Sequence, residues 1–308
     1  MLTIVKKIFQ LIIVLLLQGV FACCTSAQPQ KAKRAEKSDG PKEDSTILSV
    51  TYDVYYQRVM EVPKQEKDIM RLDIGTHSSQ FVSLIDEWVR ENNVLMVKNS
   101  PYTKQGYRSM DYRVFKNTPK QGYQYFTHSP GWISTRDKTD SLFTWELMEG
   151  DTTVCEYSCK KAQTTFRGRT WTVWYTLDLP YSDGPWKFCG LPGLVLHAYE
   201  SEGYFRFNCI GIEEGDGHEI KLRTPKSGLL DVYSHERAAE LMLLQEWDRF
   251  AFIEQISPLP GKMISYTSPG GKVYKPGEWP PQTAILYEKF PGVNMKKKYP
   301  PKRSQTKK

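Results

Sequence analysis

The chain has 308 residues, of which 40% are hydrophobic and 13% aromatic, and its formal net charge is +7. A chain of this length forms one large domain or two small ones, and its aromatic content predicts a packed core rather than disorder. The positive excess is concentrated in a leader that lacks acidic residues and in the tail from Lys296 to Lys308. The remainder is nearly neutral, which argues against a nucleic-acid partner.

The first 27 residues have the pattern of an export signal. Two lysines precede a mostly apolar run, Phe9–Ala22, and the small residues Thr25–Ala27 follow at a predicted cleavage site. The apolar run is too short and too interrupted by glutamines to predict a membrane-spanning helix. We therefore predict that residues 1–27 are a signal peptide and that the mature chain begins at Gln28.

A second kind of signal overlaps the same leader. Val20–Cys23 has the outline of a lipobox, in which Cys23 would be lipidated, but Phe21 is bulky for that motif. We favour the cleaved signal and expect an exported protein, periplasmic or associated with the outer membrane. No later stretch approaches the length of a membrane helix, so we do not expect an integral membrane protein.

Three segments are expected after the leader. Residues 28–45 are rich in Lys, Glu, Gln, Ser and Pro, which predicts a disordered linker. Residues 46–256 carry the apolar periodicity of a single β-rich domain. Residues 257–308 are rich in Pro, Gly and Lys, which predicts an irregular extension with a disordered basic tail. We interpret the tail as a solubilising terminus, with anionic lipid as the alternative partner.

The domain begins with two predicted strands and a predicted helix. Apolar and polar residues alternate through Val50–Tyr56 and Met70–Ile74, which is typical of strands with one buried face. Apolar residues between Phe81 and Val89 then recur at helical spacing behind Ser78, a suitable N-cap. We therefore expect an amphipathic helix here.

Between residues 123 and 212 the sequence predicts successive strands with short breaks. They are Tyr123–Phe126, Leu142–Leu147, Thr152–Tyr157, Thr170–Leu179, Leu194–Tyr199 and Tyr204–Ile212. Ser201–Gly203 predicts a hairpin turn, and the short connections favour an antiparallel meander. Within the fourth strand, alternation directs Trp171 to the core face and Trp174 to the largely polar face.

A second helix is expected over residues 234–256, with Ser234 as its N-cap. The predicted fold class is therefore α+β, with a predominantly antiparallel, curved and half-barrel-like β-sheet and one or two packed helices. The half-barrel is an analogy with lipoprotein carriers. Its concave face, covered by helices, is the expected place for a ligand.

Four cysteines follow the leader and are candidates for disulfide bonds in an exported protein: Cys155, Cys159, Cys189 and Cys209. Three pairings of them are open. Cys155 and Cys159 would lie about 13 Å apart on one extended strand, so a bond between them needs a turn. Sequence spacing does not choose among the pairings.

The signatures of common hydrolases, zinc proteases and nucleotide-binding proteins are absent from the sequence. His235 precedes a glutamate but lacks the second histidine of a zinc motif, so we interpret it as a surface residue at a helix start. Cys189 and His197 would allow thiol catalysis, and together with Cys155 and Cys159 they would allow a metal site. We favour disulfides and structural roles, so we predict no catalytic residue, metal or cofactor.

Two further features are weak candidates for ligand binding. Arg167 and Arg169 flank Gly168, and guanidinium groups match carboxylate and phosphate geometry, although a solvated turn is the favoured interpretation. Trp174 is a candidate ligand platform, although burial under a helix would explain it equally well.

The most distinctive stretch is Gly184–Leu196, in which glycines bracket a proline between apolar residues. Its motif residues are Gly184, Pro185, Trp186, Gly190, Leu191, Pro192, Gly193 and Leu194. Gly190 and Gly193 permit backbone angles or close contacts that other residues resist, and Pro192 stiffens the turn. We interpret the motif as a rigid turn anchored in the core.

The Gly-Leu-Pro-Gly-Leu-Val core of this stretch resembles the motif of the GLPGLI family, secreted envelope proteins of unknown function from Gram-negative bacteria. Tyr157–Ala162, Phe166–Thr176 and Asp178–Pro180 are similar to further blocks of that family. Val195 stands where the family name has isoleucine, which is similar in volume. The resemblance implies no substrate, cofactor or catalytic residue.

We therefore predict a non-enzymatic cell-envelope protein that binds a hydrophobic, lipid-like ligand or an envelope protein partner. One alternative is an envelope hydrolase or metal-dependent enzyme that uses the Cys and His residues. Another is a structural accessory of an outer-membrane receptor, because the resemblance is to envelope proteins found beside such receptors.

Overall fold

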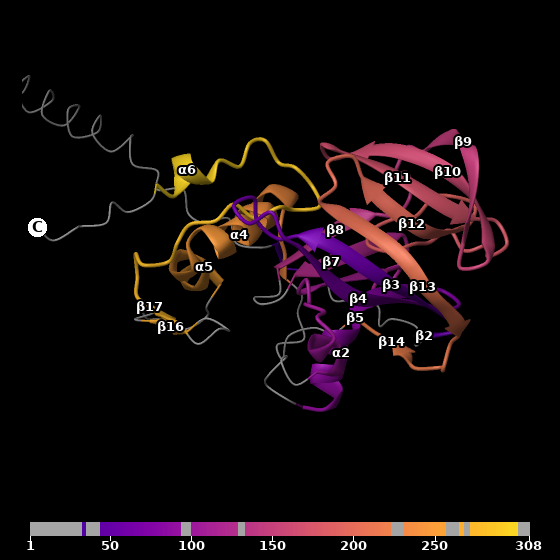
Figure 1. Cartoon of the computed structure of the whole chain (residues 1–308), viewed down its shortest axis with the longest axis horizontal. Coiled ribbons are helices and arrows are strands. Elements are labelled where there is room, and N and C mark those ends of the chain that lie inside the picture. Colours follow the sequence, from indigo (N-terminus) through magenta and orange to yellow (C-terminus); the bar gives the residue numbers. More distant parts are fainter. Residues whose placement is uncertain are drawn as a thin grey trace, which may run out of the picture. The chain divides into compact units, whose positions relative to one another are not determined.

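A computed structural model of the chain (Figure 1) describes residues 33–34, 44–93, 100–128, 133–222, 231–256, 265–267 and 272–300. All of them belong to one unit, Lys33–Lys308. The predicted signal peptide, most of the predicted linker and the basic end of the tail lie outside the described residues.

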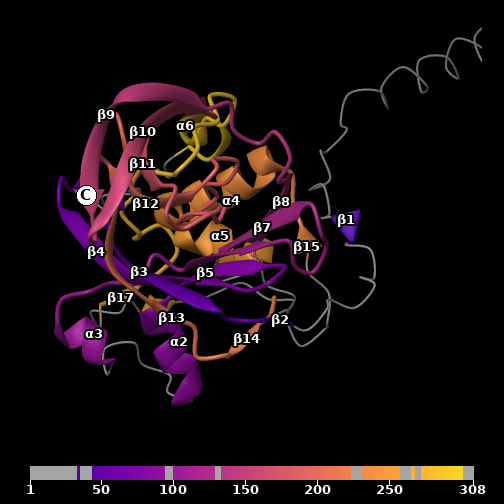
Figure 2. The same ribbon diagram turned by 90° about the vertical axis from the view of Figure 1, so that its right-hand side faces the viewer.

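Most of the strands form one curved sheet that does not close on itself (Figures 1 and 2). In sheet order they are β1 (Lys33–Arg34), β15 (Asp231–Val232), β8 (Ile133–Lys138), β7 (Tyr123–His128), β6 (Tyr112–Lys116), β5 (Ser79–Ser83), β4 (Gln65–Ile74), β3 (Leu48–Gln57), β13 (Phe205–Glu214), β12 (Leu194–Glu200), β11 (Arg169–Thr176), β10 (Tyr157–Phe166) and β9 (Glu146–Val154). From β8 to β9 every pairing is antiparallel, whereas β15 pairs with β8 in parallel. The predicted α+β class with a predominantly antiparallel curved sheet is confirmed.

Helices and two small sheets flank the main sheet. They are α2 (Leu84–Glu91), α3 (Pro101–Lys104), α4 (His235–Trp247), α5 (Arg249–Ile256) and α6 (Met295–Lys298), and the pairs β2 (Asp44–Ser45) with β14 (Glu219–Ile220) and β16 (Tyr266–Thr267) with β17 (Val273–Tyr274). α4 packs against β8, and α2 packs against β4 and β5. Within the described residues, no helix combines the length and apolar character needed to cross a membrane.

The second helix starts where the sequence predicts. The hydroxyl of Ser234 accepts a hydrogen bond from the backbone N–H of Arg237, which satisfies one of the free donors at the start of α4. The hairpin turn between β12 and β13 is also confirmed, because the N–H of Gly203 bonds to the carbonyl of Glu200. Both features are local, and local sequence signals therefore identify them.

Alternation of residue type accounts for the buried face of the sheet. The alternate residues Val50, Tyr52, Val54 and Tyr56 of β3 are all buried, as a period of two predicts. Trp171 of β11 is fully buried as well, and its ring centroid lies 5.1 Å from that of Trp186 in the motif turn. The sheet therefore encloses a largely aromatic core.

Two glycines let the motif turn approach the sheet. Gly190 has a φ of +90°, a conformation that side chains disfavour. A Cβ atom on Gly193 would lie only 1.9 Å from the carbonyl oxygen of Thr176, at the end of β11. The turn therefore touches the backbone of β11 at a point where no side chain fits.

A buried ammonium group holds the same turn against β6. Lys116 pairs with Asp183 and donates hydrogen bonds to the carbonyl oxygens of Gly184 and Phe188 at 2.7 and 2.8 Å. The hydroxyl of Ser79 on β5 donates to the other carboxylate oxygen of Asp183. Because these partners come from separate strands, the turn is fixed by tertiary contacts as well as by its own residues.

Three predicted elements are wrong in their bounds. Ser79–Ser83, expected in the first helix, forms β5, and the helix begins only at Leu84. The strand expected over residues 142–147 begins at Glu146, and the strand expected over Thr152–Tyr157 is interrupted by the hairpin turn at Cys155 and Glu156, both with positive φ. Apolar spacing alone does not separate a short buried strand from a helix, nor does it locate this turn.

The predicted linker also ends earlier than expected. Asp44 is buried, and its carboxylate accepts hydrogen bonds from the backbone N–H groups of Thr76, His77 and Ser78 at 2.7–3.0 Å. Burial would raise the pKa of Asp44, but these hydrogen bonds outweigh it and lower the pKa. Asp44 therefore belongs to the folded domain.

The predicted irregular extension packs against the domain over residues 282–290. Its backbone N–H groups at Gln282, Ile285 and Lys289 donate to carbonyl groups of α4, of Arg58 and of Arg167, at 2.8–3.1 Å. The segment thus connects α4, the end of β3 and the β10–β11 turn, and it supplies one wall of the site described next.

Candidate functional site

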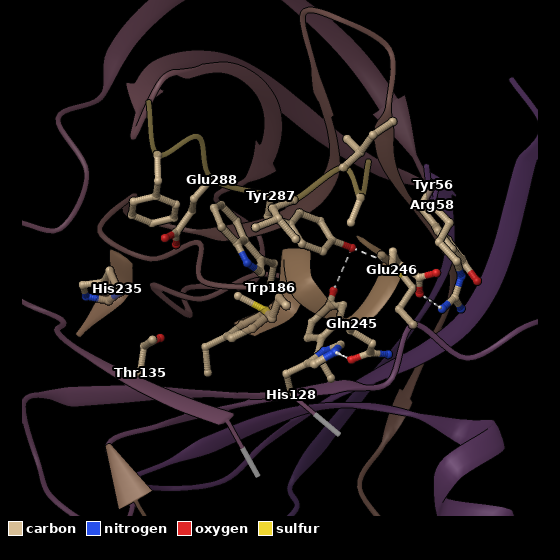
Figure 3. A pocket seen from close by; sticks show the side chains of 18 of the residues that line it. Tyr56, Arg58, His128, Thr135, Trp186, His235, Gln245, Glu246, Tyr287 and Glu288 are labelled. Carbon is tan, nitrogen blue, oxygen red and sulfur yellow. Dashed lines mark hydrogen bonds and ion pairs between the residues drawn. The ribbon is translucent and has the colours of Figure 1, made fainter. Parts of the chain in front are cut away.

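A cavity lies between one face of the sheet, α4, the motif turn and segment 282–290 (Figure 3). The volume of the cavity that is open to the centres of water molecules is about 100 Å³. This volume holds several waters or a small ligand. The cavity lining includes Tyr56, Arg58, Tyr112, Phe126, His128, Thr135, Trp186, Lys187, His235, Met242, Gln245, Glu246, Tyr287 and Glu288.

Strand register brings one wall of the cavity together. Tyr112 of β6 is paired with His128 of β7, and Phe126 of β7 is paired with Thr135 of β8. Paired residues and every second residue share a face of a sheet, so these four side chains point the same way. The rings of Tyr112 and Phe126 are stacked with centroids 5.1 Å apart.

Tyr287 from the extension closes the apolar end. The hydroxyl of Tyr112 donates to the Tyr287 oxygen at 3.1 Å, and the Tyr287 hydroxyl contacts the sulfur of Met110 at 2.9 Å. The Tyr287 ring stacks on Trp186, with centroids 5.4 Å apart. Burial raises the pKa of both phenols well above the usual value, so this wall is uncharged.

A histidine and an ion pair form the end nearest α4. Nε2 of His128 lies 3.1 Å from the amide oxygen of Gln245, and burial lowers the pKa of His128 to about 4. The imidazole is therefore neutral at neutral pH and donates this hydrogen bond. Arg58 and Glu246 lie beside it, with 3.8 Å between guanidinium nitrogen and carboxylate oxygen.

The opposite end is a buried charge network of five residues: Asp137, Arg167, Lys187, His235 and Glu288. The ammonium of Lys187, whose side chain is 2% exposed, pairs with Asp137 at 2.9 Å and with Glu288. The guanidinium of Arg167 pairs with the same two carboxylates, at 2.8 Å for Glu288. Two cations and two anions thus neutralise one another.

The network keeps its carboxylates ionised. Burial by itself would raise the pKa of Asp137, but the hydrogen bond from His235 at 2.9 Å and the charges of Lys187 and Arg167 hold it well below its usual value. The pKa of Glu288 is lowered in the same way, because Lys187 and Arg167 outweigh the effect of burial. Neither carboxylate is therefore a proton donor near neutral pH.

Asp137→Asn should flatten the acid dependence of stability. The folded-state pKa of Asp137 lies below that of an unfolded chain, so its stabilisation is complete above about pH 4 and is lost as the pH falls further. We expect the free energy of unfolding, measured with urea, to fall more between about pH 7 and about pH 3 in the wild type than in the variant. An equal loss in both would contradict the depressed pKa.

The control for that comparison is Asp151→Asn, at an exposed position of the edge strand β9. It removes the same charge without touching a buried partner. The control variant should retain the wild-type difference between the two pH values.

One polar atom of the cavity wall has no protein partner. The indole N–H of Trp186 is buried, and no acceptor among the residues that the structure describes bonds to it. The Trp186 side chain itself is fully buried and lines the cavity. An unpaired buried donor is costly, so an acceptor on a bound molecule would be favoured here.

The residues proposed from sequence for ligand binding lie outside this lining. Arg167 is held by Asp137 and Glu288, and the guanidinium of Arg169 is 4% exposed and pairs with Glu200 and Glu202. They are not the solvated arginines of an ordinary turn, because protein carboxylates already occupy both. Trp174 is half-buried on β11, with the Lys161 ammonium 5.7 Å from its ring centroid. Arg167 reaches the cavity only indirectly, through the lining residues His235 and Glu288.

The Cys and His residues considered for catalysis are not brought together. Cys189 contacts the carbonyl of Thr139, whereas Cys155 contacts Cys209, and His197 on β12 is paired with Asn208 of β13. Across the described segments of the chain, no group of three or more His, Cys, Asp or Glu side chains is placed to hold a metal ion. All four cysteines are free thiols in this structure.

No lining residue of the cavity was predicted from sequence to bind a ligand, and three of them were expected in other surroundings. His235, expected at the surface, contacts Asp137, and Tyr287 and Glu288 come from the extension that was expected to be irregular. A signal for the last two does exist, since Ala284–Tyr287 is a short continuous apolar run of the kind that buried strands have. This run is short and lies inside a segment rich in Pro, Gly and Lys, so it does not by itself predict a packed element.

A family model described as "Protein of unknown function (Porph_ging)" matches residues 164–197, a span that includes the motif turn Gly184–Leu196. This match confirms the resemblance to the GLPGLI family. The sequence matches no curated protein.

Comparisons of structure give low similarity. PNGF-II, solved in two space groups, has 16% identity, with TM-scores of 0.37 and 0.35, and 59% and 61% of this chain is covered. Only 29% and 31% of the PNGF-II chain is covered, so the present chain spans less than one third of it. A LolA superfamily protein from Nitrosomonas europaea has 8% identity and a TM-score of 0.21, with 59% of this chain and 88% of that chain covered.

Proposed function

We propose that the protein binds a small, largely apolar molecule with one hydrogen-bond acceptor in the cavity beside α4. The observation that carries the proposal is a lining of aromatic, thioether and aliphatic side chains that also holds the unpaired indole N–H of Trp186. Ligand sites typically combine such an apolar lining with a few placed polar groups. A small ligand suits the cavity volume better than a protein partner does.

The charged groups of the cavity support binding rather than catalysis. Lys187 and Glu288 are neutralised within the buried network, and Arg58 is paired with Glu246. Burial keeps His128 uncharged, and its ring is hydrogen-bonded to Gln245. A general acid, base or nucleophile must have a proton or lone pair free for its substrate. The cavity therefore fits a non-enzymatic binding protein of the cell envelope, in line with the predicted export signal.

Filling the cavity tests the proposal. Met242→Trp on α4 places a larger side chain among the lining residues, and we expect at least about a tenfold loss of affinity, about 1.4 kcal/mol, for an apolar ligand. The measurement is titration with N-phenyl-1-naphthylamine, whose fluorescence rises in apolar sites, together with mass spectrometry of molecules extracted from the purified protein.

Glu236→Trp is the matched control, because it adds the same ring at an exposed position of the same helix. It should leave probe affinity unchanged. Equal affinity in Met242→Trp and the wild type, with both folded by circular dichroism, would show that the cavity is not the binding site.

A further inference from the structure

The thiols of Cys155 and Cys209 lie side by side. Cys155 is in the turn between β9 and β10, and Cys209 is on β13, 54 residues later in the chain. Their sulfur atoms are 3.2 Å apart, and Sγ of Cys155 is also 3.2 Å from the carbonyl oxygen of Cys209. A shift of about 1 Å would bring the sulfurs to the bond length of about 2.05 Å.

The other two cysteines have different neighbours. Sγ of Cys159, which is fully buried, contacts the carbonyl oxygen of Tyr157 at 3.5 Å. Sγ of Cys189 lies 3.8 Å from the carbonyl oxygen of Thr139. Of the three pairings that the sequence leaves open, the geometry therefore favours the one that contains a Cys155–Cys209 bond.

The two thiols differ in access. Cys155 is half-buried, whereas Cys209 is 7% exposed. Burial and the neighbouring Cys155 raise the pKa of Cys209 well above the usual value for a thiol. Cys155 is therefore the thiol that meets a reagent from solvent first, and Cys209 is positioned to react with it from inside.

We infer that Cys155 and Cys209 form a disulfide by exchange with an oxidising disulfide, such as oxidised glutathione or a thiol–disulfide oxidoreductase of the envelope. The Cys155 thiolate attacks one sulfur of the oxidant, which forms a mixed disulfide and releases the first thiol. The Cys209 thiolate then attacks Sγ of Cys155 and releases the second thiol. Two thiol protons leave with the two reduced sulfurs, so atoms and electrons balance.

The bond would tie distant parts of the sheet together. In sheet order, β12 and β11 lie between β13 and β10, yet the β9–β10 turn reaches Cys209 because the sheet curves. A covalent link here would hold that curvature. In the unfolded chain it would close a loop of 54 residues and so lower the conformational entropy of that state. This inference does not depend on ligand binding in the cavity.

Peptide mapping without reductant tests the inference directly. The full chain is incubated with oxidised glutathione, digested with trypsin and a glutamate-specific protease, and examined by mass spectrometry. Cleavage after Glu156 separates Cys155 from Cys159. We expect one cross-linked pair of peptides, from Cys155 and Cys209, about 2 Da lighter than the reduced pair. Free thiols at both positions, or Cys209 linked to Cys159 or Cys189, would overturn the pairing.

Thermal unfolding gives a second measurement. Reductant should lower the melting temperature of the oxidised wild type, and of Cys189→Ser, by about 10 °C. Cys155→Ser, a change at a half-buried turn, should melt at one temperature with or without reductant. A reductant effect that persists in Cys155→Ser would overturn the inference.

Discussion

Gly193→Ala should destabilise the protein by at least about 3 kcal/mol, one of the largest effects expected of a single methyl group. The added Cβ would lie 1.9 Å from the carbonyl oxygen and 2.8 Å from the carbonyl carbon of Thr176. Ordinary contacts begin near 3.5 Å, and both atoms belong to the backbone of β11, so no rotamer change relieves the overlap. The turn or the strand must move. Urea unfolding followed by tryptophan fluorescence measures the loss.

Gly211→Ala is the matched control. Gly211 lies on β13, has no positive φ, and an added Cβ would meet nothing within 4 Å. We expect a change within about 0.5 kcal/mol of the wild type. If Gly193→Ala is as mild as this control, the close contact between the motif turn and β11 does not exist in solution.

Lys187→Met should cost about 3–5 kcal/mol, because it removes one of two cations from a buried network and leaves an uncompensated carboxylate. Asp137 and Glu288, whose side chains are 5% and 10% exposed, would then share Arg167, and His235 would contact only Asp137 of the two. Methionine keeps much of the side-chain volume, so the effect measures charge rather than packing. Unfolding by urea again gives the free energy.

Two comparisons sharpen this second test. Lys221→Met removes a lysine whose pair with Glu219 is more than half exposed on both sides, and it should cost less than about 1 kcal/mol. The double variant Lys187→Met with Glu288→Gln restores the charge balance, so it should recover part of the loss. A loss in Lys187→Met no larger than that in Lys221→Met would argue against the network.

Sequence patterns identified the parts of the fold that depend on neighbouring residues. The alternation in β3, the Ser234 cap and the turn before Gly203 are all encoded within about ten residues, and the structure confirms each. The two-residue turn at Cys155 and Glu156 was missed because neither residue is a usual turn former. Positive φ at these positions is imposed by the pairing of β9 with β10.

The cavity could not be predicted because its partners are far apart in the chain. Lys187 meets Glu288 across 101 residues, and Arg167 meets it across 121. A glutamate in a Pro- and Lys-rich segment has the same local pattern whether it is solvated or buried in a pair. The motif turn was interpreted as structural, and no local pattern indicates that its Trp186 and Lys187 also line a cavity.

The position of β3 in the sheet has a consequence for the order in which the chain folds. β3 forms a hairpin with β4 as soon as residue 74 is available, but its other edge pairs with Phe205–Glu214. Until those residues are available, the edge of β3 presents unpaired backbone groups to any strand nearby. The middle of the sheet is thus completed late, and a chain interrupted before residue 205 retains an open, aggregation-prone edge where the finished protein has its core.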